Sequence, residues 1–268
     1  MSAPAVRRRT LTVVVVYPDL LGTYGDGGNG LVLARRARWR GIDATLIQAD
    51  SGRPLPRGDL YCLGGGEDGP QVRAATSLIG EGTLARAVDD GAVVLAVCAG
   101  FQLVGRSFPD AADRPHEGLG LLDVTTRKGG LRRAVGELVA DIDAGAPRGR
   151  DGTPLPRLTG FENHGGVTTL GPEARPLARV VSGVGNGAGD GTEGAWAGRV
   201  VGTYLHGPVL ARNVALADLL LGWALGDGGT ELLAPLDDHE EDALRAERLA
   251  AAPASGRARG AGRRTAVR

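Results

Sequence analysis

The chain has few cysteines and no long apolar run. Its two cysteines, Cys62 and Cys98, have no second pair among 268 residues, so neither a disulfide framework nor a zinc site built on thiolates is expected, and a reducing cytosol is favoured. The longest uncharged run, Gly91 to Gly105, is shorter than the ~20 residues that a membrane-spanning helix requires. These absences predict a cytoplasmic protein without a transmembrane segment.

The amino-terminal residues resemble a secretion signal only in part. Three arginines, Arg7 to Arg9, precede the apolar stretch Leu11 to Val16. That stretch is too short for the apolar core of a signal peptide, and Pro18 and Asp19 follow it at once. We therefore expect residues 1–10 to form a flexible amino terminus and the folded part to begin at residue 11.

Positive charge is not in excess, and lysine is almost absent. The 31 basic and 31 acidic residues give a net charge of zero, which disfavours a general nucleic-acid binder, because such proteins need a surplus of positive charge. The only lysine, Lys128, is followed by Gly129, so the chain has no P-loop for ATP. Gly-x-Ser-x-Gly, Cys-x-x-Cys and His-x-x-x-His patterns are also missing, which disfavours a serine hydrolase and a zinc enzyme. We expect no metal and no cofactor in this chain.

Strand and helix patterns alternate over the first hundred residues. Apolar runs predict strands at 11–17, 43–48, 60–63 and 92–97, and amphipathic stretches predict helices at 29–41 and 71–89. This alternation predicts an α/β fold, with a mostly parallel central sheet and helices on both faces.

After Phe108 the pattern changes to short strands separated by Gly and Pro clusters. Strands are expected at 121–126, 136–142, 167–170, 178–184 and 198–204, so the second half should be strand-rich, and one helix is expected at 213–225. Residues 237–268 are acidic and then rich in Ala, Gly and Arg, which predicts a disordered tail. One domain over residues 11–236 is therefore expected.

Cys98 is the strongest candidate for chemistry. It follows the most apolar strand of the chain, and the small residues Ala99 and Gly100 come next, where a helix begins. A nucleophile elbow requires this pattern, because small neighbours permit the sharp turn. The helix amino terminus favours a thiolate, and the N–H of Ala99 can donate to an oxyanion. The alternative is a core cysteine in an apolar strand, since free cysteine is among the most buried residues.

A glycine run follows the third expected strand. Gly64, Gly65 and Gly66 let backbone N–H groups point into the crevice at the carboxyl edge of the sheet, where they can complete an oxyanion hole. The alternative is a mobile loop in a glycine-rich protein. Cys62 lies within the strand, so we expect it in the core.

Four histidines compete for the role of proton carrier. His206 ends a strand immediately before Gly207 and Pro208, which places its ring at the same sheet edge as Cys98. His164 has polar neighbours and ranks second, with a loop histidine bonded to backbone as its alternative. The other two are His116 and His239, and the latter sits in the acidic tail and is the poorest candidate.

These segments resemble a known family. The segment Ala96-Val97-Cys98-Ala99-Gly100-Phe101-Gln102 resembles the nucleophile segment of class I glutamine amidotransferase domains, and Tyr204-Leu205-His206-Gly207-Pro208 resembles the histidine segment of their cobyric acid synthase-like branch. The segments Tyr24-Gly25-Asp26-Gly27-Gly28-Asn29 and Trp39-Arg40-Gly41-Ile42 are most similar to the GatD-type glutaminase subunits of lipid II isoglutaminyl synthase. The resemblance spans about residues 10–235 and implies a flavodoxin-like fold.

The resemblance also implies roles for individual residues. Cys98 would attack the side-chain amide of glutamine, and His206 would move the proton. Gln102 and the glycine loop, with Gly65 and Gly66, would hold the bound amide beside Ala99. The substrate-binding arginine would be Arg132 or Arg133.

One departure from the family pattern concerns the third catalytic group. Most members carry a glutamate two positions after the histidine, where this chain has Pro208. Another group, or the backbone, must therefore orient His206, and Asp26 is a candidate.

The family implies a heterodimer with a MurT-type, Mur-ligase-like subunit. That partner would bind ATP and magnesium and amidate the D-glutamate of lipid II to D-isoglutamine, at the inner face of the membrane. The alternatives are a glutaminase subunit for another ATP-dependent ligase with a corrin-like substrate, a non-catalytic scaffold of the same fold, and a cysteine peptidase on the same framework. Pro208 favours the scaffold, whereas the presence of both Cys98 and His206 at strand ends favours catalysis.

Overall fold

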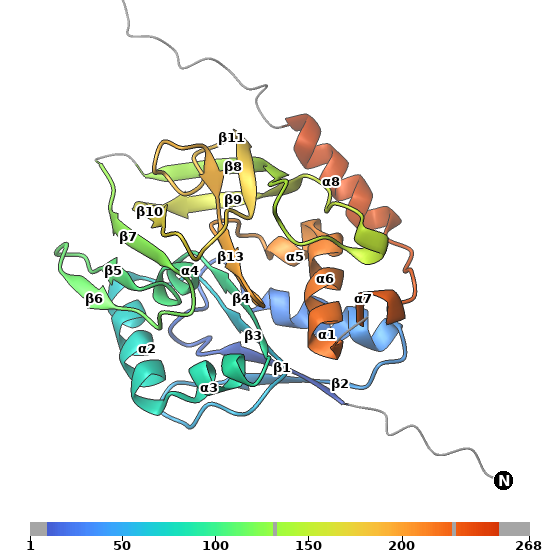
Figure 1. The fold of residues 1–268 in the computed structure, drawn as a ribbon, viewed down its shortest axis with the longest axis horizontal. Helices are drawn as coiled ribbons and strands as arrows, with labels where there is room; N and C mark the ends of the chain where they lie inside the picture. Colours follow the sequence, from blue (N-terminus) through green and yellow to red (C-terminus); the bar gives the residue numbers. More distant parts are fainter. Residues whose placement is uncertain (1–9, 131–132, 227–228, 252–268) are drawn as a thin grey trace, which may run out of the picture.

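The computed structural model describes residues 10–130, 133–226 and 229–251 (Figure 1). Its centre is a six-stranded sheet in the order β13-β14-β4-β3-β1-β2. These strands are β1 (Leu11–Val16), β2 (Ala44–Ala49), β3 (Leu60–Leu63), β4 (Val93–Val97), β13 (Ala195–Ala197) and β14 (Val200–Thr203). All neighbours are parallel except β13 and β14. The predicted α/β fold is therefore confirmed, and the carboxyl ends of five strands meet at one edge.

Helices cover both faces of this sheet. Helix α1 (Gly28–Trp39) packs against β1, β2 and α6 (Val214–Leu225). Helices α2 (Asp68–Glu81) and α3 (Thr83–Asp89) lie on the other side of the sheet in Figure 1. The core lies between these layers and includes all of β3 and β4, whose side chains are buried. None of the helices in the described ranges is long and apolar enough to cross a bilayer.

The single helix predicted at 71–89 is two helices. Gly82 has φ +62°, a left-handed conformation that ends α2 before α3 begins. Glycine adopts this conformation without the steric cost of a Cβ. The prediction of one continuous helix was wrong because the periodicity continues across this break.

The second half contains two four-stranded sheets, in the orders β10-β7-β5-β6 and β12-β11-β8-β9. Their strands are β5 (Ser107–Pro109), β6 (Pro115–Glu117), β7 (Val124–Lys128), β8 (Ala134–Ile142), β9 (Leu158–His164), β10 (Gly166–Leu170), β11 (Ala178–Ser182) and β12 (Thr192–Glu193). The strand-rich second half is confirmed. Strand β9 was not predicted, and it carries His164 as its last residue, so this histidine is not in a loop.

Short helices complete the fold: α4 (Ala99–Leu103), α5 (Val209–Arg212) and α7 (Gly229–Leu232), with the 3₁₀ turn Arg150–Gly152. The carboxyl-terminal segment also contains α8 (His239–Ala251), which corrects the disorder predicted from residue 237. Acidic residues in its first turn offset the helix dipole. Arg245 donates from Nε to the Arg157 carbonyl at 3.1 Å, which fixes the helix to the loop before β9. The rest of the predicted tail, 252–268, and residues 1–9 lie outside the described residues.

Candidate active site

Cys98 lies at the sharp turn between β4 and α4. Its φ of +53° and ψ of −107° are unusual for a residue with a side chain, and such strain is often found at functional sites. The Cys98 N–H donates to the Thr203 carbonyl at 2.9 Å, which holds the turn against β14. A Cβ on Gly100 would lie 2.8 Å from Cβ of Leu63, so only a glycine fits there. The sequence pattern thus produces the expected elbow.

His206 follows β14 and lies in a buried pair with Asp26. Its Nδ1 is 2.7 Å from Oδ2 of Asp26, and only 1% of each residue is exposed. Asp26 comes from the loop between β1 and α1. Its carboxylate therefore orients the imidazole in this chain, where Pro208 replaces the glutamate that the family pattern places after the histidine.

Cys98 and His206 are close neighbours across Gly65. The position of a Cβ on Gly65 is 2.8 Å from Cε1 of His206 and 3.6 Å from Cβ of Cys98. Within the described ranges, the ring nitrogen Nε2 makes no hydrogen bond to nitrogen or oxygen. It is therefore available to the Cys98 thiol, with which the ring interacts.

The charge of His206 follows from its surroundings. Burial lowers its pKa, but the hydrogen bond to Asp26 and the interaction with Cys98 outweigh this effect and raise the pKa to about 10. The imidazole is therefore protonated at neutral pH. An imidazolium is thus the charged group beside the Cys98 side chain, and its charge does not depend on α4, which has only five residues.

The glycine loop after β3 has a different role from the one predicted for Gly65. The Gly65 N–H donates to Oδ2 of Asp26 at 2.9 Å, so it helps to hold the carboxylate and is not free for an oxyanion. Gly66 lines the cavity beside Cys98 and Ala99. A Cβ on Gly66 would lie 2.7 Å from the carbonyl oxygen of Leu20, so the loop requires glycine here.

The second half of the chain supplies one wall of the site. Asn163, at the end of β9, has its carbonyl oxygen 4.0 Å from Sγ of Cys98. Its side-chain Nδ2 donates to the hydroxyl of Tyr24 at 2.6 Å, and the Tyr24 ring lies 4.8 Å from that of His206. Arg133 donates to both the side chain and the carbonyl of Asn163. Asn163 was not given a role from the sequence, and Tyr24 was quoted only as part of the segment 24–29, without a role of its own.

These groups surround a cavity of about 200 Å³. Among the described residues, the charged ones that line it are Glu67, Asp68, Asp110, Lys128 and Arg133. Carboxylates and cations at one cavity suit a small zwitterion such as an amino acid. Of the two predicted arginines, the structure places Arg133 at the cavity, whereas Arg132 lies outside the described residues.

The remaining candidates lie elsewhere or have other partners. Burial raises the pKa of the Cys62 thiol to about 12, consistent with a core cysteine. His164 lines the cavity, but its Nδ1 is 3.0 Å from the Gly166 carbonyl oxygen, and its ring stacks on Tyr204. His116 contacts Asp110 through Nε2 at 3.1 Å, and His239 begins α8.

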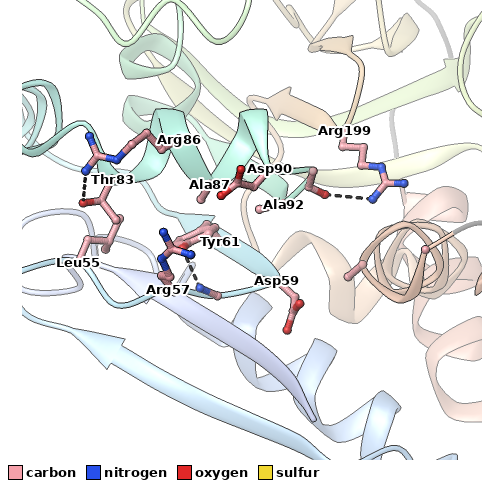
Figure 2. A pocket seen from close by; sticks show the side chains of 14 residues that line it. Leu55, Arg57, Asp59, Tyr61, Thr83, Arg86, Ala87, Asp90, Ala92 and Arg199 are labelled. Atoms are coloured by element: carbon pink, nitrogen blue, oxygen red, sulfur yellow. Dashed lines mark hydrogen bonds between the residues drawn. The ribbon is translucent and has the colours of Figure 1, made fainter. Parts of the chain in front are cut away.

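A larger cavity, of about 550 Å³, lies at the opposite edge of the central sheet (Figure 2). Its lining residues include Asp59, Ala92 and Arg199, which directly precede β3, β4 and β14. This is the amino edge of the parallel strands. None of its described lining residues is a cysteine or a histidine, so size alone does not identify the active site.

The parallel sheet, with the elbow cysteine and the strand-end histidine at its carboxyl edge, has the flavodoxin-like fold of class I glutamine amidotransferases. Solved structures share the fold. PurLQS from Thermotoga maritima matches with a TM-score of 0.53 and 16% identity, over 84% of this chain and 96% of that one. A crystal structure described as glutamine amidotransferase matches with a TM-score of 0.52 and 18% identity, over 79% and 98%.

The CobB/CobQ-like glutamine amidotransferase domain matches residues 12–214, and the chain belongs to this family. The GatD subunit of lipid II isoglutaminyl synthase (glutamine-hydrolyzing) from Staphylococcus aureus (strain N315) is 35% identical over 216 residues, which cover 79% of this chain and 83% of that protein. The same subunit from Streptococcus pneumoniae (strain ATCC BAA-255 / R6) is 33% identical over 80% of each chain. Cobyric acid synthase from Pelotomaculum thermopropionicum is 39% identical over 52% of this chain and 27% of that protein. The predicted resemblance is confirmed.

Proposed function

We propose that this chain is the glutaminase subunit of a lipid II isoglutaminyl synthase. The observation that carries the proposal is the contact of His206 with Asp26 beside Cys98, in a chain similar over most of its length to two GatD subunits. A protein that kept only the fold would have no need of a buried charged pair beside a strained cysteine. The scaffold alternative is therefore disfavoured.

The proposed first step is attack of the Cys98 thiolate on the side-chain carbonyl carbon of glutamine. As the carbon–sulfur bond forms, the carbonyl oxygen becomes an oxyanion, with the N–H groups of Ala99 and Gly66 as donors. His206 gives its proton to the amide nitrogen, the carbon–nitrogen bond breaks and ammonia leaves. A glutamyl thioester remains on Cys98.

The proposed second step is hydrolysis of this thioester. Water attacks the acyl carbon while His206, now neutral, accepts a proton from it. The carbon–sulfur bond breaks, glutamate leaves, and the thiolate–imidazolium pair is restored. Asp26 keeps Nδ1 of His206 protonated throughout, so that Nε2 is the nitrogen that exchanges protons.

Substrate binding follows from the charges around the cavity. Arg133 would bind the α-carboxylate of glutamine, and the carboxylates of Glu67, Asp68 and Asp110 would attract its α-ammonium group. Gln102, which also lines the cavity, would contact the side-chain amide.

The ammonia would be used by a MurT-type partner subunit in a heterodimer. This partner would bind ATP and magnesium and amidate the D-glutamate of lipid II, working in the cytoplasm at the inner face of the membrane. The support is the similarity to two GatD subunits of lipid II isoglutaminyl synthase and the absence of a P-loop from the sequence. A ligase with a corrin substrate is the second candidate, because cobyric acid synthases match a shorter part of the chain.

The test compares nitrogen sources in the complex with the partner ligase. Cys98→Ala should abolish amidation of lipid II from glutamine and leave amidation from ammonium salts unchanged, because the variant loses only the nucleophile. Cys62→Ala, the buried cysteine in β3, is the matched control and should keep both activities. Glutamine-dependent amidation by Cys98→Ala would contradict the proposal.

A further inference from the structure

A row of hydrogen-bonded side chains lies beside the cavity and runs from α2 to β7. Its members are Gln71, Gln102, Tyr204, Thr168 and Thr126. The successive distances are 3.1 Å from Gln71 to Gln102, 3.2 Å to Tyr204, 2.6 Å to Thr168 and 2.7 Å to Thr126. All are buried except Gln102, which is partly exposed at the cavity.

A backbone carbonyl determines which atom in each pair of this row donates the hydrogen bond and which accepts it. The side-chain atom of Gln71 that lies 3.2 Å from the Ala99 carbonyl oxygen must be Nε2, because a carbonyl only accepts. The same Nε2 faces Gln102, so the facing atom of Gln102 must be Oε1. The two ends of a carboxamide have nearly the same shape, and hydrogen-bond partners are what distinguish them.

The hydrogen bond at the other end of the Gln102 carboxamide is consistent with Oε1 facing Gln71. Its Nε2 faces Tyr204 and donates to the hydroxyl oxygen, so the single Tyr204 proton goes to Thr168. Burial raises the pKa of Tyr204, so this proton is retained. A Cβ on Gly166 would lie only 2.6 Å from Nε2 of Gln102, so the backbone of β10 confines the carboxamide from a further side.

We infer that Gln71 is a positioning residue that sets which end of the Gln102 carboxamide faces the substrate amide. With Oε1 held toward Gln71, its second lone pair accepts an N–H of the bound glutamine side chain. If the Gln102 carboxamide were reversed, its N–H group would face the N–H group of the substrate amide and no hydrogen bond would form. An ester has no N–H to donate to Oε1, so the observed orientation of Gln102 favours an amide substrate over an ester. This inference rests on the proposed function, because it takes glutamine as the substrate.

The test is Gln71→Glu, which keeps the shape of the side chain and replaces its donor by an acceptor. The introduced carboxylate repels both the Ala99 carbonyl and Oε1 of Gln102. We therefore expect the Gln102 carboxamide to reverse its orientation, with its N–H group toward residue 71. Glutamate formation is measured for the full chain with its partner ligase, from glutamine and from L-glutamate γ-methyl ester, which has the same carbonyl but no N–H. We expect kcat/KM to fall about tenfold more for glutamine than for the ester, the effect of one hydrogen bond in a buried site. An equal fall for both substrates, or no fall, would overturn the inference.

If Gln71→Glu does not fold, Tyr204→Phe provides the same test. The variant lacks the hydroxyl that accepts from Nε2 of Gln102. We expect a smaller fall in kcat/KM, several-fold, again for glutamine only. Tyr61→Phe is the matched control, because Tyr61 is equally buried and its hydroxyl contacts Gly58 and Pro56 at the other edge of the sheet. The control should leave the ratio of the two substrates unchanged.

Cys98→Ala, measured alongside, separates the two claims. Glutamate formed by that variant would contradict the proposed function. Loss of glutamate formation in Cys98→Ala, together with an unshifted substrate ratio in Gln71→Glu, would contradict only the role of Gln71.

Discussion

The imidazole of His206 and the carboxylate of Asp26 come from segments near opposite ends of the described chain, and their contact sets the charge of the site. Oδ2 of Asp26 binds both Nδ1 of His206 and the N–H of Gly65. The Gly65 N–H thus fixes the carboxylate while the carboxylate fixes the ring. The buried pair therefore joins three loops at the carboxyl edge of the sheet.

Replacing Asp26 should change both the rate and its pH dependence. The pKa of His206 is raised to about 10 partly by Asp26, so Asp26→Asn should lower that pKa. The imidazolium is then lost at lower pH, and the alkaline fall of kcat/KM moves to lower pH. We also expect kcat to fall by about 100-fold or more, because the ring loses its fixed tautomer. Rate profiles for glutamine hydrolysis from pH 6 to pH 10.5 measure both effects.

Asp19→Asn is the control for this prediction. Asp19 lies on the same loop, but its carboxylate binds Ser51. Its profile should match that of the parent protein. An unchanged alkaline limb in Asp26→Asn would contradict the assignment of Asp26.

At the scale of elements, two neighbouring glycines have opposite roles. Gly82 ends α2 with φ +62°, whereas Gly80 lies within α2 with open space around its missing Cβ. Gly82→Ala should lower the free energy of unfolding by about 1 kcal/mol, because a Cβ is strained at positive φ. Gly80→Ala should raise it by about 0.5 kcal/mol, because alanine loses less entropy in a helix. Urea unfolding measures both, and the same sign for the two would contradict the break at Gly82.

The elements that the sequence predicted are those with strong local patterns. Strands such as β3 and β4 are apolar runs closed by small residues, and both were predicted within one residue of their bounds. Strand β9 was missed because it carries polar residues, Asn163 and His164, that face the site. Helix α8 was missed because its acidic composition suggested disorder, and the contact of Arg245 that fixes it comes from a distant segment.

The candidate site was predictable in part. Cys98 and His206 follow strands, and parallel strands bring their carboxyl ends together. Asp26 could be named only as a candidate, because it lies on a loop 180 residues from its partner. The use of the Gly65 N–H and the contacts of Gln71 and Asn163 depend on segments that meet only in the folded chain.

At the scale of the whole molecule, buried arginines join the first helix to the carboxyl-terminal segments. Arg36 in α1 is 1% exposed and binds Asp218 in α6 and Asp238 before α8. Arg40 also binds Asp218, at 2.6 Å. These ion pairs hold residues near position 238 against the helix that follows the Asp26 loop.

Removing Asp218 should therefore be costly. Asp218→Ala leaves two buried guanidinium groups with one carboxylate fewer, and we expect a loss of about 3 kcal/mol in the free energy of unfolding. Asp141→Ala is the control, because its pair with Arg157 is exposed and should contribute less than about 1 kcal/mol. Equal losses in urea unfolding would show that burial of the pair is unimportant.

The most direct measurement of the central claim is the detection of the acyl-enzyme. The full chain and its partner ligase are mixed with glutamine, quenched in acid within the first turnover, digested and examined by mass spectrometry. The account predicts a glutamyl adduct on the peptide that contains Cys98 and none on the peptide that contains Cys62. Ammonia release without an adduct on Cys98, or with an adduct on another residue, would contradict it.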